Sequence, residues 1–421
     1  MSKDKPITFV ILGVTGDLYQ NKLASSLFSL FQKDFLPKDF QVLGFARRPL
    51  NDVLFRDFTR EVLVKKGASK EKLDDFLGHF FYLQGNFDEE QSFLDLGQTL
   101  GEMDLGLGRC SSKLFYLAVP PDLYNNIFEN IYKAGLSVPC AKNFEEDASH
   151  WTRILVEKPF GHDLKTAKQL DETLAKYFID SQVFRIDHYL EKKAVQSILD
   201  FRFKNGIFEP LWNNQKISKI RLVVHEPNDL SKRGDFYDNL GALKDVGQNH
   251  MLQMLALVAM DKPVELSSTV IHQARENILA NTHLKKVLVR GQYEGYVNEP
   301  GVNKDSKTET FFRVMLSVDT PRWEGVDFEI ESGKALSKYD VYVDVYFTDS
   351  NARLTFSISS FVGESEAYEE VFKDSILGDM TRFVGNREII FQWKIIEEII
   401  NDFYNSSLVI YKKGVRAKEI K

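Results

Sequence analysis

Four kinds of polar functional group lie within residues 185–192, which read RIDHYLEK. Asp187, His188, Tyr189 and Lys192 supply a carboxylate, an imidazole, a phenol and an ammonium group. An imidazole and an ammonium group can bind a phosphate or a carboxylate, and a carboxylate with an imidazole can move protons. If a helix begins near this cluster, His188 and Lys192 lie one turn apart and face the same side. Taken alone, the cluster fits a charged surface turn equally well.

His250 is a second candidate for proton transfer, and it lies within residues 245–253, which read DVGQNHMLQ. Polar side chains interrupt an otherwise apolar helical pattern here, which spans residues 243–260. A single histidine on a helix is more often structural than catalytic. Asp245 precedes His250 by five residues, which is about 140° around an α-helix. A carboxylate that orients His250 must therefore come from elsewhere in the sequence.

The first half of the chain alternates between strand-like and helical patterns. Residues 7–12 form a continuous apolar, β-branched run, which is typical of a buried parallel strand. Further strands are expected at residues 40–46, 80–87, 113–119, 153–156 and 182–186. Helical spacing separates these runs, so the sequence predicts a Rossmann-like, doubly wound parallel sheet of the α/β class.

The turn after the first predicted strand contains two of the three glycines of a dinucleotide fingerprint. It consists of Gly13, Val14, Thr15, Gly16, Asp17 and Leu18. Backbone N–H groups of such a strand-to-helix turn point at an anion. Because Ile11 stands at the first glycine position, an ordinary tight turn fits the motif equally well when it is taken alone.

Coenzyme preference is indicated at the end of the second predicted strand. NAD-binding proteins carry an acidic residue there, whereas this chain has Arg47 and Arg48. Two guanidinium groups suit a 2′-phosphate, so NADP is the predicted coenzyme, and two surface arginines are the alternative.

Two further predicted strands end in candidate ligand residues, at the edge where open α/β sheets bind ligands. Pro120 and Pro121 end the strand at residues 113–119. Lys158 follows the strand at residues 153–156, where it can reach between coenzyme and substrate. Asp163 is the expected N-cap of the next helix.

After residue 200 the alternation of strands and helices stops. Strands are expected at residues 217–224, 310–318, 326–331, 339–347 and 352–357, and helices at residues 243–260, 267–279 and 366–379. This mixture predicts an α+β domain with a largely antiparallel sheet. With 421 residues the chain exceeds one typical domain. The predicted domains are residues 1–178 and 179–421, with the boundary near residues 176–181.

Composition narrows the classes of partner. The formal net charge of -7 argues against nucleic acid or an acidic membrane, but permits a local basic site for a small phosphorylated ligand. Two cysteines are too few for a disulfide framework and match no metal-ligand spacing, so a reducing cytoplasm is expected. No apolar signal core or membrane-spanning run is present, so neither secretion nor membrane insertion is expected.

Considered together, these motifs resemble the glucose-6-phosphate dehydrogenase family. The similar blocks occur in the order of the family and are residues 13–18, 45–47, 115–121, 157–161, 185–192, 245–253 and 333–336. The resemblance implies oxidation of glucose 6-phosphate at C1 to 6-phosphogluconolactone, a reaction of the oxidative pentose phosphate pathway. NADP would accept the hydride, and no metal is implied.

The resemblance also implies a role for each matched residue. His250 looks like the general base, and Asp187 looks like the carboxylate that orients it. The implied substrate ligands are His188, Tyr189 and Lys192 for the phosphate, Glu226 and Asp245 for the sugar hydroxyls, and Lys158, Lys334 and Lys338 as further contacts. The implied coenzyme ligands are Gly13, Val14, Thr15, Gly16, Asp17, Leu18, Lys22, Arg47, Pro120, Pro121 and Lys158.

Two departures from the family pattern bear on these expectations. Glu191 stands where a glycine is common, and its charge would oppose phosphate binding unless it faces solvent. Residues 339–366 are fewer than usual in a region that builds the intersubunit sheet of the family, although a homodimer or higher homo-oligomer is still expected. A dehydrogenase for another sugar phosphate and a non-catalytic NADP-binding relative remain alternatives. The latter predicts loss of His250 or Asp187, and both are present.

Overall fold

The protein is described by a computed structural model that covers residues 5–69, 71–139, 150–204, 206–230, 234–348, 352–359 and 364–421. The chain forms two compact units. Unit 1 consists of Met1–Phe160, Gln169–Ile186 and Gly363–Phe383, and unit 2 consists of Gly161–Lys168, Asp187–Val362 and Val384–Lys421. The chain passes into unit 2 for its longest segment between Ile186 and Asp187.

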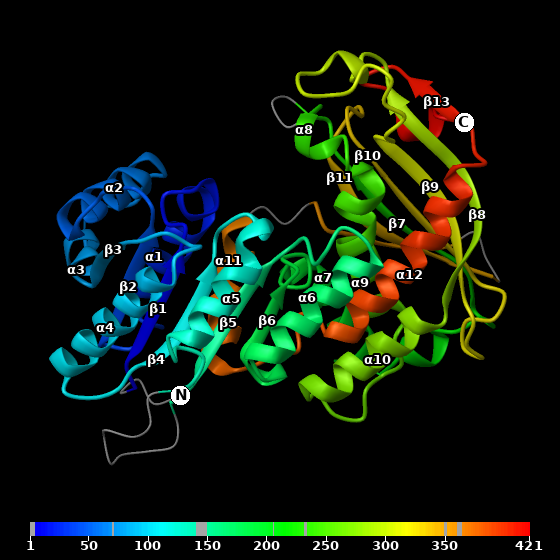
Figure 1. The fold of residues 1–421 in the computed structure, drawn as a ribbon. Coiled ribbons are helices and arrows are strands. Elements are labelled where there is room, and N and C mark those ends of the chain that lie inside the picture. The colour runs from blue at the N-terminus through cyan, green and yellow to red at the C-terminus, as the bar shows by residue number, and fades with distance from the viewer. Residues whose placement is uncertain are drawn as a thin grey trace. The chain divides into compact units, whose positions relative to one another are not determined.

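Unit 1 is built on a six-stranded sheet in the order β3-β2-β1-β4-β5-β6 (Figure 1). Every neighbouring pair is parallel. The strands are β1 (Ile7–Leu12), β2 (Phe40–Ala46), β3 (Phe80–Gln84), β4 (Ser112–Leu117), β5 (Thr152–Glu157) and β6 (Val183–Ile186). The predicted doubly wound parallel sheet is therefore confirmed, and its order changes direction between β1 and β4.

Helices connect these strands. They are α1 (Ala24–Gln32), α2 (Asp52–Lys65), α3 (Leu73–Gly78), α4 (Glu90–Leu107), α5 (Tyr124–Lys133) and α6 (Leu164–Tyr177), with a short π-helix, η1, at Tyr19–Leu23. Side-chain caps begin two of them. Asn51 accepts a hydrogen bond from the N–H of Leu54 at 2.9 Å, and the predicted cap Asp163 accepts one from Thr166 at 2.7 Å.

Helix α11 (Glu364–Leu377) belongs to unit 1 although it lies late in the sequence. Its apolar side chains join the core of this unit. The ring of Phe372 lies 5.7 Å from that of Phe9 on β1 and 5.6 Å from that of Tyr116 on β4. Burial of this apolar surface explains why the segment returns to unit 1. The predicted domains, residues 1–178 and 179–421, are each continuous and so do not describe the return of Gly363–Phe383 to unit 1.

Unit 2 contains a seven-stranded sheet in the order β12-β11-β7-β10-β9-β8-β13. The strands are β7 (Ile217–His225), β8 (Thr282–Tyr293), β9 (Phe311–Val318), β10 (Asp327–Gly333), β11 (Asp340–Phe347), β12 (Arg353–Ser357) and β13 (Leu408–Tyr411). The pairs β10–β7 and β13–β8 are parallel and the other pairs are antiparallel, which confirms the largely antiparallel sheet.

The helices of unit 2 are α7 (Lys193–Leu199), α8 (Gly234–Tyr237), α9 (Leu252–Ala259), α10 (Ser268–Ala280) and α12 (Asn386–Phe403). Two π-helices occur as well, η4 (Asp200–Lys204) and η6 (Leu243–Met251). The single helix expected at residues 243–260 is thus η6 followed directly by α9. The difference matters because π-helical turns often occur at functional sites.

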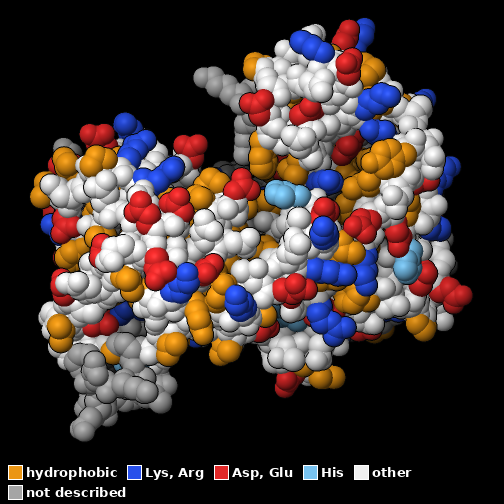
Figure 2. Space-filling model, viewed as in Figure 1, with side chains coloured by type: hydrophobic (Ala, Val, Ile, Leu, Met, Phe, Trp, Pro, Cys, Tyr) orange, Lys and Arg blue, Asp and Glu red, His pale blue; other side chains and the backbone are white. Residues whose placement is uncertain are grey.

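The surface carries charges of both signs. On the face shown in Figure 2, basic and acidic side chains are interspersed over most of the surface. Many form ion pairs, such as Lys285 with Asp327 at 2.6 Å and Lys413 with Asp229 at 2.8 Å. Within the described residues, no helix is long and apolar enough to cross a membrane.

Candidate active site

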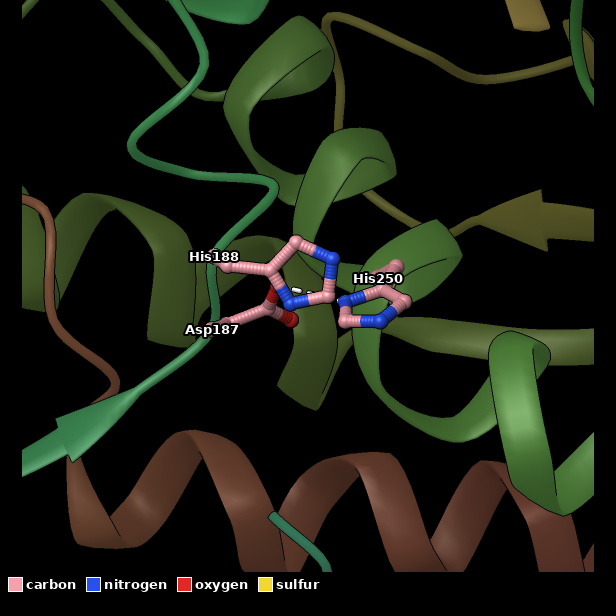
Figure 3. Close-up of side chains that lie close together, drawn as sticks. All are labelled: Asp187, His188 and His250. Atoms are coloured by element: carbon pink, nitrogen blue, oxygen red, sulfur yellow. Dashed lines mark hydrogen bonds and ion pairs between the residues drawn. The ribbon is translucent and has the colours of Figure 1, made fainter. Parts of the chain in front are cut away.

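A hydrogen-bonded acid–imidazole pair lies inside unit 2. The Nδ1 atom of His250 is 2.5 Å from Oδ1 of Asp187, and the side chains are 4% and 2% exposed (Figure 3). An ionised carboxylate only accepts hydrogen bonds, so Nδ1 of His250 must be the donor. The neutral imidazole then carries its basic lone pair on Nε2. Such a ring can accept a proton, and the carboxylate stabilises the imidazolium that results.

Asp187 is positioned by the turn that follows β6. Its Oδ1 atom also accepts a hydrogen bond from the backbone N–H of Tyr189 at 3.0 Å, which fixes the carboxylate. Helix α7 begins at Lys193, after the cluster. His188 and Lys192 therefore belong to the turn, and the helical spacing considered for them does not apply.

The π-helix η6 carries His250 and is fixed by helix α12. Gln392 donates a hydrogen bond to the carbonyl of Asn249 at 3.4 Å. Glu388, also on α12, accepts one from Gln253 at 2.8 Å. These contacts lie on both sides of His250 in the sequence, so α12 holds the segment that aims the imidazole at Asp187.

Aromatic and cationic groups surround the imidazole of His250. The ring of Tyr189 stacks on it with centroids 4.2 Å apart and planes 20° apart. The ring of His188 meets it edge-on at 4.6 Å. The Nζ atom of Lys192 lies 3.7 Å from the centre of the Tyr189 ring. The structure thus brings the predicted phosphate set together with the predicted base.

Tyr339 is a neighbour of this set that the sequence did not indicate. Burial raises the pKa of Tyr189 well above its ordinary value, and the nearby Tyr339 and Glu226 raise it further. Tyr339 itself is 47% exposed. The sequence indicated it only as the first residue of the strand expected at residues 339–347, so no signal marked it as part of the site.

A second cluster joins the residues predicted to bind sugar hydroxyls. The ammonium group of Lys334 forms ion pairs with Glu226 and with Asp245, the latter at 3.5 Å. Burial alone would lower the pKa of Lys334, but the carboxylates of Asp245 and Glu226 outweigh it and raise the pKa. The lysine therefore remains charged between two acceptors.

Two further side chains bear on the expected substrate contacts. Lys338 is 69% exposed, and its ammonium group pairs with Asp340 at 2.8 Å. Glu191 is 1% exposed and thus does not face solvent. Solvent exposure therefore does not keep the charge of Glu191 away from a bound phosphate.

The predicted coenzyme turn follows β1 in unit 1, at the point where the strand order changes direction. Gly13 has φ +90°, and a Cβ atom there would lie 2.4 Å from the carbonyl oxygen of Ala118, just after β4. Only glycine fits such a position. The N–H of Gly16 bonds to the carbonyl of Gly13 at 2.9 Å, which closes the turn. The backbone is thus shaped for close approach of an anionic ligand.

The other predicted coenzyme residues flank this turn or follow neighbouring strands. Arg47 follows β2, is exposed, and lies 6.0 Å from the ring centre of Phe87. Lys22 lies on η1, where burial and the neighbouring Lys66 lower its pKa. Pro120 and Pro121 follow β4, and Lys158 follows β5. All of these belong to unit 1, whereas the acid–imidazole pair belongs to unit 2.

Asp187, His188 and His250 also offer three potential metal-ligand atoms within 4.8 Å of one another. A metal on Nδ1 of His250 would have to replace the hydrogen bond to Asp187. The positive ammonium group of Lys192, which lies against the ring of Tyr189, suits an anion better than a metal cation.

The fold and the site define a class of protein. A parallel sheet in the order 3-2-1-4-5-6 with a glycine turn after β1 is the dinucleotide-binding arrangement. A second α+β unit with a buried acid–imidazole pair follows it in the chain. Together these features are those of a two-domain, nicotinamide-dependent dehydrogenase.

The chain belongs to the glucose-6-phosphate dehydrogenase family. The family model for the NAD-binding domain matches residues 10–197, and the model for the C-terminal domain matches residues 199–361. The chain is 34% identical to "Glucose-6-phosphate 1-dehydrogenase 5, cytoplasmic" of Arabidopsis thaliana, over 97% of this chain and 89% of that protein.

Solved structures agree with this assignment. A glucose-6-phosphate dehydrogenase in complex with its substrate glucose 6-phosphate is similar with a TM-score of 0.86 and 27% identity, over 98% of this chain and 96% of that chain. The glucose-6-phosphate 1-dehydrogenase of Mycobacterium avium gives a TM-score of 0.83 and 29% identity, over 97% and 94%.

Proposed function

We propose that the chain oxidises the C1 hydroxyl of glucose 6-phosphate to 6-phosphogluconolactone with NADP as its coenzyme. The observation that carries this proposal is the buried hydrogen bond between His250 and Asp187, with Lys192 and His188 beside it. One group can take a proton there, and two others can bind a phosphate. Family membership supplies the identity of the sugar phosphate.

His250 acts as the general base. In its neutral form the imidazole has a lone pair on Nε2 that can accept a proton. Nε2 accepts the proton of the C1 hydroxyl, and the hydrogen on C1 leaves with its electron pair as a hydride, for which bound NADP would be the acceptor. Asp187 holds the ring in one tautomer through Nδ1 and stabilises the positive charge that forms on it.

The substrate is bound by the two clusters of unit 2. His188, Tyr189 and Lys192 bind the phosphate, Glu226 and Asp245 bind sugar hydroxyls, and Lys334 contacts the substrate beside these two carboxylates. Lys158 and Lys338 are the further contacts, although Lys338 must leave its ion pair with Asp340 to serve as one.

The coenzyme is bound by unit 1. The backbone of residues 13–18 receives the diphosphate, which fits the turn that only glycine can form at Gly13. Arg47 binds the 2′-phosphate, and Lys22, Pro120, Pro121 and Lys158 complete the set. Bound NADP supplies the acceptor for the hydride.

Family membership also supports proposals on the roles of the two domains, the oligomeric state and the location of the protein. NADP binding is assigned to residues 1–178, and substrate binding and oligomerisation to residues 179–421. A homodimer or higher homo-oligomer is proposed. Relatives named as cytoplasmic enzymes support the cytoplasm as the location.

The test is the formation of reduced nicotinamide, followed by its absorbance, with each coenzyme and either glucose 6-phosphate or glucose. NADPH should form rapidly only with the phosphorylated sugar, and EDTA should not change the rate. Equal rates with another hexose 6-phosphate would favour a different sugar phosphate as substrate. Tight NADP binding without turnover of any sugar would favour the non-catalytic relative, and loss of activity in EDTA would favour a metal at Asp187.

A further inference from the structure

Tyr237 has a buried hydroxyl group that the roles assigned above do not use. It ends helix α8, and its side chain is 3% exposed. Its hydroxyl oxygen is buried and has no hydrogen-bond partner among the described residues. Burying a hydroxyl without a partner costs free energy, and such groups in native proteins call for an explanation.

Neighbouring buried tyrosines in the same apolar cluster are paired. Tyr296 donates a hydrogen bond to Asp238 at 2.8 Å, and Tyr411 donates one to the carbonyl of Lys334 at 2.8 Å. The ring of Tyr296 lies 6.4 Å from that of Tyr237. Burial of tyrosine in this cluster therefore does not by itself leave a hydroxyl without a partner.

Tyr237 lies against the cluster of Glu226, Asp245 and Lys334. The Nζ atom of Lys334 is 5.2 Å from the centre of the Tyr237 ring. Burial raises the pKa of Tyr237 well above its ordinary value, and the charges of Asp245 and Glu226 are among the groups that raise it further. The hydroxyl thus keeps its proton near neutral pH and can donate it to an acceptor.

A sugar hydroxyl is the complement of this set of groups. Glu226 and Asp245 can only accept, whereas Tyr237 and Lys334 can donate. A hydroxyl that gives its hydrogen to a carboxylate presents its oxygen to a donor. A water molecule could accept the hydrogen bond of Tyr237 in the absence of substrate. If a sugar hydroxyl accepts it instead, removal of the tyrosine hydroxyl weakens substrate binding.

We propose that Tyr237 is a substrate ligand that donates its hydroxyl hydrogen to a non-reacting ring hydroxyl of the sugar phosphate. The inference rests on the proposed function, because the sugar phosphate identifies the acceptor. It adds a specificity-determining side chain that neither the sequence motifs nor the ion pairs indicated.

The test compares Tyr237→Phe with the matched variant Tyr296→Phe. Tyr237→Phe removes a hydroxyl without a protein partner, so Tm should stay the same or rise slightly. kcat/KM for glucose 6-phosphate should fall about tenfold, mainly through KM, because one hydrogen bond to substrate is lost. Tyr296→Phe removes a satisfied hydrogen bond, so its Tm should fall while kcat/KM stays unchanged. Unchanged kcat/KM for Tyr237→Phe would overturn the inference, whether its Tm falls or stays the same.

Deoxy substrates identify the contact. Among the 2-, 3- and 4-deoxy analogues of glucose 6-phosphate, one should give the wild type and Tyr237→Phe equal kcat/KM. A difference that persists with all three analogues would mean that Tyr237 acts indirectly, which overturns the inference.

Calorimetry with glucose 6-phosphate alone separates this inference from the proposed function. If the wild type binds the sugar phosphate without turnover, the proposed function fails, and weaker binding by Tyr237→Phe would still support the inference. If the wild type does not bind it, both fail. If the wild type is active and Tyr237→Phe matches it in every measurement, only the inference fails.

Discussion

The imidazole Nδ1 of His250 lies 2.5 Å from the carboxylate Oδ1 of Asp187, although the residues are 63 positions apart in the sequence. The turn after β6 fixes the acid, and the π-helix η6 fixes the base. Because both side chains are buried, little water competes for their hydrogen bond. The pair is therefore set in one tautomer before any substrate binds.

Replacement of the acid tests what this contact does. Asp187→Asn should lower kcat by roughly 10²–10⁴-fold with little change in KM, because the amide cannot stabilise the imidazolium. An amide that donates to Nδ1 would also place the hydrogen of the imidazole on Nε2, the wrong atom for a base. Steady-state kinetics give both constants, and a thermal unfolding curve shows whether the variant is folded. A folded variant with an unchanged kcat would contradict the role of Asp187.

Lys192 should contribute to binding of the phosphate. Lys192→Ala is expected to raise KM for glucose 6-phosphate about 10- to 100-fold, because a charged hydrogen bond to the phosphate is lost. Any slow turnover of unphosphorylated glucose should be unaffected. Lys193→Ala is the matched control, since this neighbour is exposed. Equal effects of the two variants, or an equal loss with glucose, would argue against a phosphate contact.

Coenzyme choice should depend on Arg47. Arg47→Ala is expected to lower kcat/KM for NADP by about tenfold or more and to leave that for NAD unchanged, since only NADP carries the 2′-phosphate. Arg48→Ala should have the smaller effect of the two. The measurement is kcat/KM with each coenzyme at saturating glucose 6-phosphate. A parallel loss with both coenzymes would show that Arg47 does not read the 2′-phosphate.

Glu331 makes the stability of unit 2 depend on pH. Burial alone would raise its pKa, but His225, Arg221 and Arg313 outweigh burial and lower the pKa to about 2. A carboxyl with a depressed pKa stabilises the folded state above its unfolded pKa of about 4.5, and this stabilisation is lost as pH falls toward about 2.

Glu331→Gln should therefore lower the free energy of unfolding by roughly 2–3 kcal/mol near neutral pH. The difference from the wild type should shrink as the pH falls below about 4.5. Urea unfolding at several pH values measures it. Glu398→Gln is the control, because its ion pair with His283 is about half exposed. A difference that stays constant with pH would mean that Glu331 does not titrate as described.

Local patterns were enough to predict much of the fold. The strand β1 is a run of six buried residues, so its parallel, doubly covered setting follows from composition. Asp163 lies just before a helical pattern, and its capping bond is a contact over three residues. The turn after β1 was also expected from its glycines, and the positive φ of Gly13 explains why a glycine stands there.

Long-range packing accounts for what the sequence did not show. The amphipathic pattern of α11 does not tell which sheet will cover its apolar face, yet Phe372 packs against Phe9 in unit 1. Hydrogen bonds span five residues in a π-helix and four in an α-helix, so a short apolar pattern cannot separate the two at Leu243–Met251. The sequence also could not show that the hydroxyl of Tyr237 lacks a hydrogen-bond partner, because this depends on the positions of all the groups around it.

The sequence placed the candidate site residues by type but not by contact. The spacing of Asp245 and His250 on an α-helix argued against Asp245 as the orienter, and only the resemblance indicated Asp187. The exposed ion pair of Lys338 with Asp340 was not predictable, because a surface lysine has many neighbours within reach.

The two neighbouring histidines provide the most direct test of the account. Their rings lie 4.6 Å apart, and each is assigned one role. kcat and KM for glucose 6-phosphate with NADP should be measured for His250→Asn and His188→Asn. His250→Asn should lose roughly 10²–10⁴-fold in kcat and still bind the sugar phosphate, whereas His188→Asn should raise KM and retain most of kcat. The reverse pattern, or a His250→Asn variant that turns over at the wild-type rate, would contradict the assignment of His250 as the base.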